Sequence, residues 1–166
     1  KSWISILESS FIVFLLRPHH KNFNKRLVKM PKVYFYDTGL ACSLLGIESR
    51  NHVSTHRLKC GLFESFILSE LIKSRYNKGL LPNYYFWRDK LGREIDCIVE
   101  KSDNLMPIEI KAGKTVSAEY FKDLLYWNSL SKNKSSNSYI LFGGDTAQKR
   151  SQGNVIPWHQ LKSIPL

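Results

Sequence analysis

The fold is decided by residues 93–111, which read Arg-Glu-Ile-Asp-Cys-Ile-Val-Glu, then Lys-Ser-Asp-Asn, then Leu-Met-Pro-Ile-Glu-Ile-Lys. Two apolar runs rich in β-branched side chains flank a polar break, a pattern typical of a β-hairpin. A four-residue loop at residues 101–104 makes Glu100 the cross-strand partner of Leu105. Counting outward from that pair fixes which residues of the two strands face each other.

The predicted pairing brings two acidic residues together. Asp96 lies directly opposite Glu109, with Cβ atoms about 4.5 to 5.5 Å apart. Lys111 follows Glu109 by two residues, so its side chain emerges on the same face of the strand. The hairpin therefore predicts two carboxylates and one ammonium group on a single patch of sheet.

An acid opposite an acid destabilises a strand pair unless a cation compensates the charge. Carboxylate oxygens are natural ligands of Mg²⁺, which fills its other positions with water and substrate phosphate. The ammonium group of Lys111 could then orient an attacking water or neutralise charge on a phosphate. Alternatively, Lys111 simply bridges the two acids in a surface cluster, and the hairpin alone leaves both interpretations open.

Composition favours a globular chain with an anionic partner. The 166 residues are 43% hydrophobic, and 25 Lys and Arg against 14 Asp and Glu give a net charge of +11. A surplus of this size favours nucleic acid as a partner, or less often an acidic protein or a membrane surface. The three cysteines, Cys42, Cys60 and Cys97, are widely spaced, which is typical of reduced thiols in a cytoplasmic protein. No run is long enough to cross a bilayer. Because the chain starts with Lys inside a helix-like pattern, we expect a piece of a longer protein.

The first part of the chain, residues 1–46, predicts a partial winged helix. Residues 2–9 have helical spacing, residues 11–16 and 33–36 are strand-like, and the segment between the strands forms a basic wing. The wing residues expected to contact DNA phosphates are Lys21, Lys25, Arg26 and Lys29. The alternatives are a solvated loop or one docked on an acidic neighbouring domain. Asp37 is expected to cap a helix over 38–45 rather than to act as a catalytic acid. The irregular residues 47–60 are expected to form a linker.

The remaining residues, 61–166, predict a mixed α/β (α+β) domain. Its elements follow the order helix, strand, strand, strand, helix, strand, with a last edge strand at 155–161. Glu64 lies on a buried face of the first helix, where an unpaired carboxylate is costly and requires a cation. Residues 112–115 read Ala-Gly-Lys-Thr, but a P-loop requires Gly where Ile108 stands, so no ATP site is expected.

The order of Glu64 on the first helix, Asp96 on the second strand and Glu109-x-Lys111 on the third resembles the PD-(D/E)xK nuclease superfamily. That superfamily includes restriction endonucleases and Holliday-junction resolvases. The resemblance implies a restriction-endonuclease-like αβββαβ core in which Asp96, Glu109 and the backbone carbonyl of Ile110 bind Mg²⁺, or Mn²⁺ in its place. It also implies that Lys111 polarises the attacking water and that Glu64 completes or orients the metal site.

A closer resemblance extends over nearly the whole chain. It is carried by KRLVKMPKVYFYDTGL at 25–40, GLFESFILSEL at 61–71, FWRDKLGREID at 86–96 and PIEIKAG at 107–113. These phrases resemble the C-terminal part of a family of prokaryotic AAA-type P-loop ATPases, in which an ATPase domain precedes a winged helix and a nuclease-like domain of unknown function. The resemblance implies that the N-terminal ATPase domain of the same chain is a partner.

The sequence thus leads to three hypotheses. In the first, the chain is a Mg²⁺-dependent DNA phosphodiesterase. In the second, a nuclease-like module without turnover binds DNA or a protein partner and regulates the ATPase. In the third, the second domain is structural and holds protomers of a homo-oligomer together. The intact acids and lysine favour the first hypothesis, with the second as the alternative.

Overall fold

The computed structural model describes residues 2–19, 28–102 and 104–165, and its backbone divides into two compact units. The first unit comprises residues 1–16 and 31–82, and the second comprises residues 17–30 and 83–166. Both units contain helices and strands, so the predicted mixed α/β class is confirmed. The long helix over 59–76, which the sequence analysis assigns to the second domain, belongs to the first compact unit.

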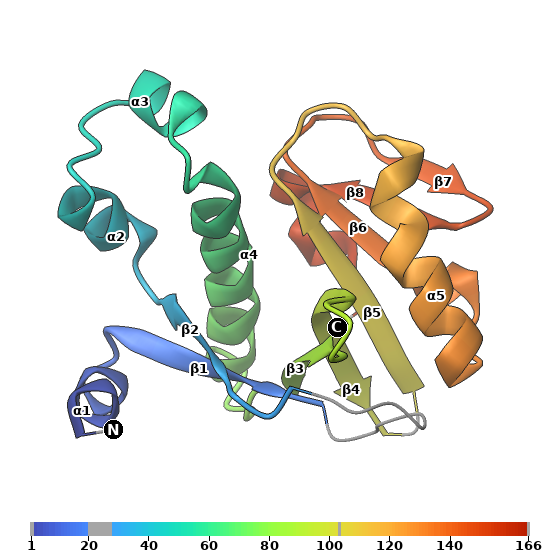
Figure 1. Cartoon of the computed structure of the whole chain (residues 1–166), viewed down its shortest axis with the longest axis horizontal. Coiled ribbons are helices and arrows are strands. Elements are labelled where there is room, and N and C mark those ends of the chain that lie inside the picture. Colours follow the sequence, from blue (N-terminus) through green and yellow to red (C-terminus); the bar gives the residue numbers. More distant parts are fainter. Residues whose placement is uncertain (1, 20–27, 103, 166) are drawn as a thin grey trace. The chain divides into compact units, whose positions relative to one another are not determined.

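The first unit consists of a strand pair and four helices (Figure 1). In chain order these are α1 (Ser2–Ser9), β1 (Val13–Pro18), β2 (Lys32–Phe35), α2 (Thr38–Leu44), α3 (Arg50–Thr55) and α4 (Lys59–Tyr76). The strands pair antiparallel from Val13 opposite Phe35 to Leu16 opposite Lys32. Asp37 caps α2 as expected, because its carboxylate accepts the N–H groups of the second and third residues of that helix.

Helix α3 corrects the expectation that the linker is irregular. Its N-cap is Ser49, whose hydroxyl accepts the backbone N–H of His52 at 3.2 Å. Every residue of the helix is at least partly exposed, so no apolar stripe marks it in the sequence. A local cap, and not burial of an apolar face, therefore defines this helix.

The second unit is built on a sheet with strand order β3-β4-β5-β6-β8-β7. Its elements are β3 (Tyr84–Arg88), β4 (Glu94–Lys101), β5 (Asn104–Lys111), the 3₁₀ helix η1 (Ala118–Phe121), α5 (Lys122–Ser131), η2 (Ser135–Asn137), β6 (Tyr139–Phe142), β7 (Gln148–Arg150), β8 (Gly153–Pro157) and η3 (Trp158–Ser163). Strands β3, β4 and β5 form the predicted antiparallel meander, and β6 runs parallel to β5. The prediction of an edge strand at 155–161 is wrong in part. Strand β8 lies inside the sheet, because β7 pairs along its outer side.

The central hairpin has the predicted register and a shorter loop than expected. Glu100 pairs with Leu105, and the ladder continues to Lys101 opposite Asn104. Only two positions separate that last pair. Ser102 has a φ of 54°, in the left-handed region that tight two-residue hairpin turns use. The neighbouring Asp103 lies outside the described residues.

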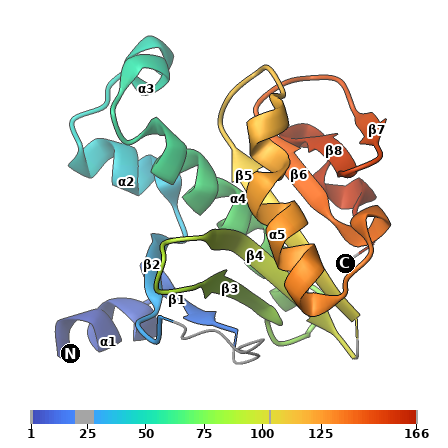
Figure 2. The same cartoon turned by 45° about the vertical axis from the view of Figure 1, so that its right-hand side comes forward.

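Helix α5 covers one face of this sheet (Figure 2). Leu124 and Trp127 of α5, with Phe121 at the end of η1, are fully buried and belong to one core cluster with Ile98 of β4 and Ile140 of β6. Burial of each large apolar side chain stabilises the fold by about 1.5 to 3 kcal/mol. The packing of α5 thus holds β4 and β5, which carry the candidate functional residues, in one rigid layer.

A close backbone approach fixes the end of β5. The N–H of Gly143, directly after β6, donates to the carbonyl of Lys111 at 3.0 Å. A Cβ atom at Gly143 would lie 2.6 Å from the carbonyl oxygen of Ala112, so only glycine permits this contact. The end of β5, where Lys111 stands, is therefore held by the neighbouring strand.

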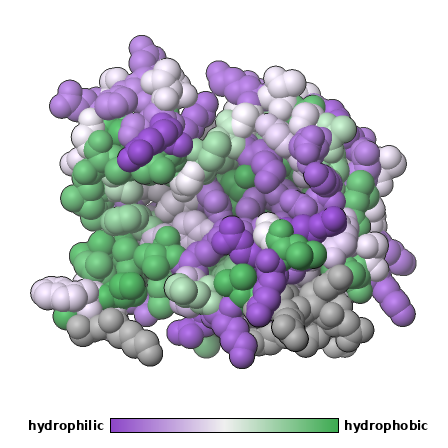
Figure 3. Space-filling model, in the orientation of Figure 1, coloured by the Kyte–Doolittle hydropathy of each residue, from purple (hydrophilic) through white to green (hydrophobic). Residues whose placement is uncertain are grey.

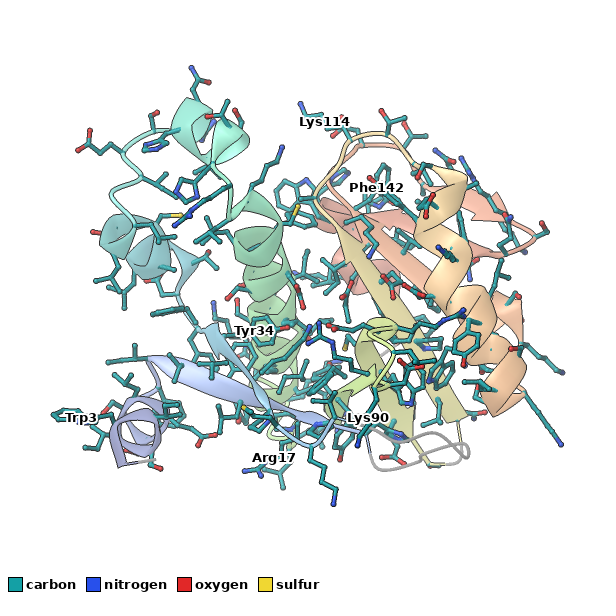
Figure 4. The ribbon with its side chains drawn as sticks, in the orientation of Figure 1. Trp3, Arg17, Tyr34, Lys90, Lys114 and Phe142 are labelled. Atoms are coloured by element: carbon teal, nitrogen blue, oxygen red, sulfur yellow. The ribbon has the colours of Figure 1, made fainter. Side chains whose placement is uncertain are left out.

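The first unit exposes large apolar side chains. Trp3 of α1 is 78% exposed and extends from its helix (Figure 4), and Leu44 of α2 is 70% exposed. On the face in Figure 3, hydrophobic side chains gather over α2 and over the β1–β2 pair. None of the helices in the described part of the chain combines the length and apolar character needed to span a bilayer.

Candidate metal centre

The adjacent ends of β4 and β5 bring Asp96, Glu109 and Lys111 together. The backbone ladder stops at Cys97 opposite Ile108, and beyond it Oδ2 of Asp96 accepts the N–H of Ile110 at 2.8 Å. The Nζ atom of Lys111 lies 3.5 Å from the same Asp96 oxygen and also donates to Oε2 of Glu109. One ammonium group therefore contacts both carboxylates, which requires both acids to point to the same side of the hairpin.

An irregularity in β4 places Asp96 at this position. Trp87 of β3 pairs with Ile95, but Tyr85 pairs with Ile98, so two residues of β4 face a single residue of β3. Such a bulge bends the strand and re-aims a side chain, and bulges are common beside functional sites. The carboxylate of Asp96 thereby replaces a backbone acceptor for the Ile110 amide.

Glu109 is a buried carboxylate with incomplete hydrogen bonding. Its exposed fraction is 2%, and its Oε1 atom has no hydrogen-bond partner among the described residues. Burial, with Asp96 close by as the second cause, raises the pKa of Glu109 well above its usual value, although Lys111 acts in the opposite direction. Charge on Glu109 is therefore unfavourable unless a further cation approaches.

Lys111 is held in its charged form. Burial alone would lower the pKa of its ammonium group, but the carboxylates of Asp96 and Glu109 outweigh that effect and raise the pKa above its usual value. At neutral pH Lys111 is a proton donor and a positive charge. It is not a general base.

The raised pKa of Glu109 in the folded state predicts how the stability of the fold changes with pH. The pKa of Glu in an unfolded chain is about 4.3. At any pH between that value and the raised pKa of the folded state, the folded state binds more protons than the unfolded state. Stability from this group is fully present below that window and is lost as the pH rises through it. We expect Glu109→Gln to remove this loss, so the metal-free variant has a higher free energy of unfolding at neutral pH.

Urea unfolding in EDTA from about pH 4 to about pH 8 measures this effect. Glu119→Gln is the matched control, because the Glu119 side chain is 78% exposed and its removal should leave the pH dependence intact. An equal pH dependence in the Glu109→Gln variant and the unaltered chain would contradict the assignment.

Glu94 is a neighbouring acid that the sequence analysis did not include. Carboxylate oxygens of Glu94 and Asp96 lie within 4.8 Å of each other, and Oε2 of Glu94 is 2.8 Å from Nε of Arg88. The spacing Glu-Ile-Asp contained the signal, because residues two apart on a strand share a face. Glu94 adds a third carboxylate to this edge of the second unit.

The other predicted site residues belong to other parts of the chain. Glu64 lies on α4 in the first unit, where its Oε1 accepts from Lys32 Nζ at 3.0 Å and from the Tyr34 hydroxyl. Lys32 supplies the cation that this partly buried carboxylate requires, and a metal-site role for Glu64 stays a prediction. Of the wing residues, Lys29 is exposed, whereas Lys21, Lys25 and Arg26 lie outside the described residues.

The residues present fit a hard divalent cation. Asp96 and Glu109 offer carboxylate oxygens, the donor type that Mg²⁺ prefers. The buried Oε1 atom of Glu109 accepts no hydrogen bond from any described residue. A cation bound at this oxygen would compensate the buried negative charge. Ile110 lies between the two acids in the chain, and metal binding by its carbonyl stays a prediction.

Comparison with known proteins gives a family without an assigned activity. Residues 59–161 match the domain of unknown function DUF4143, and residues 1–51 match the domain of unknown function DUF8612. The chain is 33% identical over 118 residues to an uncharacterized protein of Mycobacterium tuberculosis and to one of Mycobacterium bovis. These matches cover 70% of this chain and 26% of each relative, so the chain spans about a quarter of their length. No solved structure gives a significant match.

Proposed function

The chain belongs to the DUF4143 family of domains of unknown function, and we propose that its second unit is a divalent-metal-dependent nuclease module acting on DNA. One observation carries the proposal. A buried carboxylate, Glu109, shares the ammonium group of Lys111 with Asp96 and retains an oxygen with no partner among the described residues.

Each side chain has a distinct role in this proposal. Asp96 and Glu109 hold Mg²⁺, or Mn²⁺ in its place, with the Ile110 carbonyl as a further ligand. The bound ion would supply Lewis-acid stabilisation of a phosphate and lower the pKa of a water. Lys111, kept protonated by the two acids, orients that water and offsets negative charge that develops on the phosphate. Glu94 is an additional carboxylate of the second unit that would orient the site, and the role of Glu64 stays the one that the resemblance implies.

The order of the elements supports the assignment of a restriction-endonuclease-like core. An antiparallel β3-β4-β5 meander, the helix α5 and the parallel strand β6 follow in the order of a restriction-endonuclease-like core. Asp96 stands on the second strand of the meander, and the Glu109-x-Lys111 pair stands on the third. We propose that β3 to β6 of the second unit are the βββαβ part of this core. We propose a partial winged helix for the first unit, where β1 and β2 pair on either side of the basic segment.

Plasmid nicking tests the activity directly. The purified chain, incubated with supercoiled DNA and Mg²⁺ or Mn²⁺, should convert it to the relaxed and linear forms, and EDTA should stop the reaction. Nicking that proceeds equally in EDTA would overturn a metal-dependent mechanism, and no nicking with either metal would favour the module without turnover.

The proposed contacts between the basic wing and DNA lead to a second, separate prediction, which concerns the salt dependence of DNA binding. Each neutralised phosphate contributes about 0.9 units to the slope of log K against log salt on duplex DNA. Changing all four wing cations to Gln should therefore reduce that slope by about 3 to 4 units. Fluorescence anisotropy with a labelled duplex at several salt concentrations measures it. The variant carries Lys21→Gln, Lys25→Gln, Arg26→Gln and Lys29→Gln.

A control with the same loss of charge separates wing contacts from net charge. It carries Lys78→Gln, Lys90→Gln, Lys149→Gln and Lys162→Gln, all at exposed positions. A slope reduced equally in both variants would show that the wing has no special part in binding.

The alternative is a module that binds a partner and regulates an ATPase without cleaving DNA. The exposed apolar side chains of α1 and α2, Trp3 and Leu44 among them, favour it, because large exposed apolar groups often mark protein interfaces. The matched residues make up 26% of each relative, which leaves room there for the N-terminal AAA-type ATPase domain that the resemblance implies. Binding of that domain in trans, lost in Trp3→Ser and Leu44→Ser variants, would support this role.

A further inference from the structure

A cavity of about 470 Å³ adjoins the candidate metal centre in the second unit. Its walls come from the turn between β3 and β4, from the end of β5 and from the segment where η1 passes into α5. One of the lining residues is Lys111, whose ammonium group contacts both Asp96 and Glu109. The cavity therefore lies directly beside the two carboxylates to which the metal ion is assigned.

The turn between β3 and β4 holds Arg93 at the wall of this cavity. Asp89 is 2% exposed, and its Oδ1 atom accepts the backbone N–H groups of Leu91 at 2.9 Å and of Arg93 at 3.0 Å. The N–H of Asp89 donates to the carbonyl of Arg93 at 3.0 Å. Gly92 has a φ of 85°, a conformation that glycine adopts without strain. A buried carboxylate thus fixes the backbone of Arg93.

The side chain of Arg93 is oriented by an aromatic ring. Its Cζ atom lies 3.8 Å from the centroid of the Tyr126 ring. This contact uses the face of the guanidinium group and not its N–H groups. Within residues 2–19, 28–102 and 104–165, no carboxylate lies at ion-pair distance from Arg93. The guanidinium group is therefore held in place with its N–H donors available for a ligand.

The other charged groups of the cavity wall are compensated locally. Lys122 and Glu119 form an exposed ion pair at 3.7 Å. The charge of Lys111 is shared by the two acids of the metal centre. Asp123 is the second residue of α5, where the positive end of the helix dipole offsets a negative charge. Arg93 is therefore the lining cation that is left to bind an anion.

We propose that this cavity binds a phosphodiester group of a DNA strand, with the guanidinium group of Arg93 as its principal ligand. A guanidinium group holds phosphate oxygens through two parallel N–H donors, which gives the contact a defined orientation. Arg93 and Asp96 are three residues apart, about 10 Å along an extended strand, so the bound phosphate lies within a few nucleotides of the metal centre. The site rests on the proposed nuclease function and adds to it a residue that positions the DNA strand.

Fluorescence anisotropy with a labelled duplex in EDTA measures this contact in the absence of cleavage. Arg93→Gln should weaken binding about tenfold, the effect of losing one hydrogen-bonded charge contact. It should also lower the slope of log K against log salt by about 0.9 units. Arg93→Lys keeps the charge, so it should restore the slope but only part of the affinity.

Arg150→Gln is the matched control for the loss of one arginine. Arg150 is also partly exposed and lies over an aromatic ring, that of Phe121, but it does not line the cavity. The control should bind DNA with the affinity and the salt slope of the unaltered chain. Equal affinities and equal slopes in Arg93→Gln and Arg150→Gln would overturn the proposal.

A purely structural role for Arg93 would give a different pattern. Tyr126→Leu removes the ring beside the guanidinium group but leaves the positive charge in the cavity. It should therefore weaken binding less than Arg93→Gln does, and it should leave the salt slope unchanged. If Tyr126→Leu and Arg93→Gln lowered both the affinity and the slope equally, Arg93 would act only through the fold and the proposal would be wrong.

Mg²⁺-dependent nicking separates the phosphate site from the nuclease function itself. Arg93→Gln should raise KM about tenfold and change kcat little, because the contact is made before and during the reaction alike. Nicking with an unchanged KM in this variant would overturn the phosphate site and leave the nuclease function standing. A chain that binds DNA without nicking it, and binds less tightly after Arg93→Gln, would support the phosphate site and remove the nuclease function.

Discussion

We expect Asp96→Asn to lower Mg²⁺-dependent DNA cleavage at least about 100-fold, since groups that only orient metal ligands already contribute 10- to 100-fold when they are altered. Asparagine keeps the size of the side chain and an oxygen that can accept the Ile110 amide, so the hairpin should fold unchanged. It loses the negative charge that a divalent ion requires. The effect is therefore on metal affinity and rate, and not on the fold.

The measurement is the initial rate of plasmid nicking at several Mg²⁺ concentrations. Asp145→Asn is the matched control, because Asp145 is an exposed acid in the same unit and lies outside the cluster. The control should cleave at the rate of the unaltered chain. Cleavage by the Asp96→Asn variant within a few-fold of that rate would remove Asp96 from the site.

The second large effect is on stability and concerns two adjacent leucines of α5. Leu124 is fully buried in the core of the second unit, whereas Leu125 is 42% exposed. Leu124→Ala leaves a cavity in a packed core, and we expect it to cost about 3 to 5 kcal/mol. Leu125→Ala removes the same atoms from a partly exposed position and should cost less than about 1 kcal/mol.

Urea unfolding monitored by circular dichroism gives both free energies. The thermal midpoint of the Leu124→Ala variant should fall by about 6 to 20 °C, since each kcal/mol shifts a domain of this size by about 2 to 4 °C. Equal losses in the two variants would show that α5 does not present Leu124 to the core as the structure has it.

The local pattern of apolar and polar residues was sufficient to predict the central β-hairpin. The polar break centred on residues 101–104 placed Glu100 opposite Leu105, and the structure confirms that pair. The loop length was wrong because a polar run does not show where pairing stops. Lys101 and Asn104 extend the ladder although neither is apolar. Strand β7 was missed for the same reason, since its three residues, Gln148–Arg150, have no apolar face.

The electrostatic state of the candidate site could not be predicted from sequence spacing. The raised pKa of Glu109 depends first on its burial, and that burial arises from the packing of the sheet and its covering helix, far from the hairpin in sequence. The bulge that aims Asp96 at the Ile110 amide depends on how β3 pairs with β4. Sequence could name the acids and the lysine, but only tertiary contacts decide which of them carry charge.

The central claim is that Asp96 and Glu109 together bind one divalent cation. A crystal of the chain soaked in Mn²⁺ tests it most directly, because Mn²⁺ gives an anomalous signal that identifies the ion. We predict an anomalous peak in contact with carboxylate oxygens of both residues, at about the 2.0 to 2.2 Å expected for such small hard ions. Full Mn²⁺ occupancy elsewhere, with Lys111 still bridging the two acids and no peak beside them, would contradict the account.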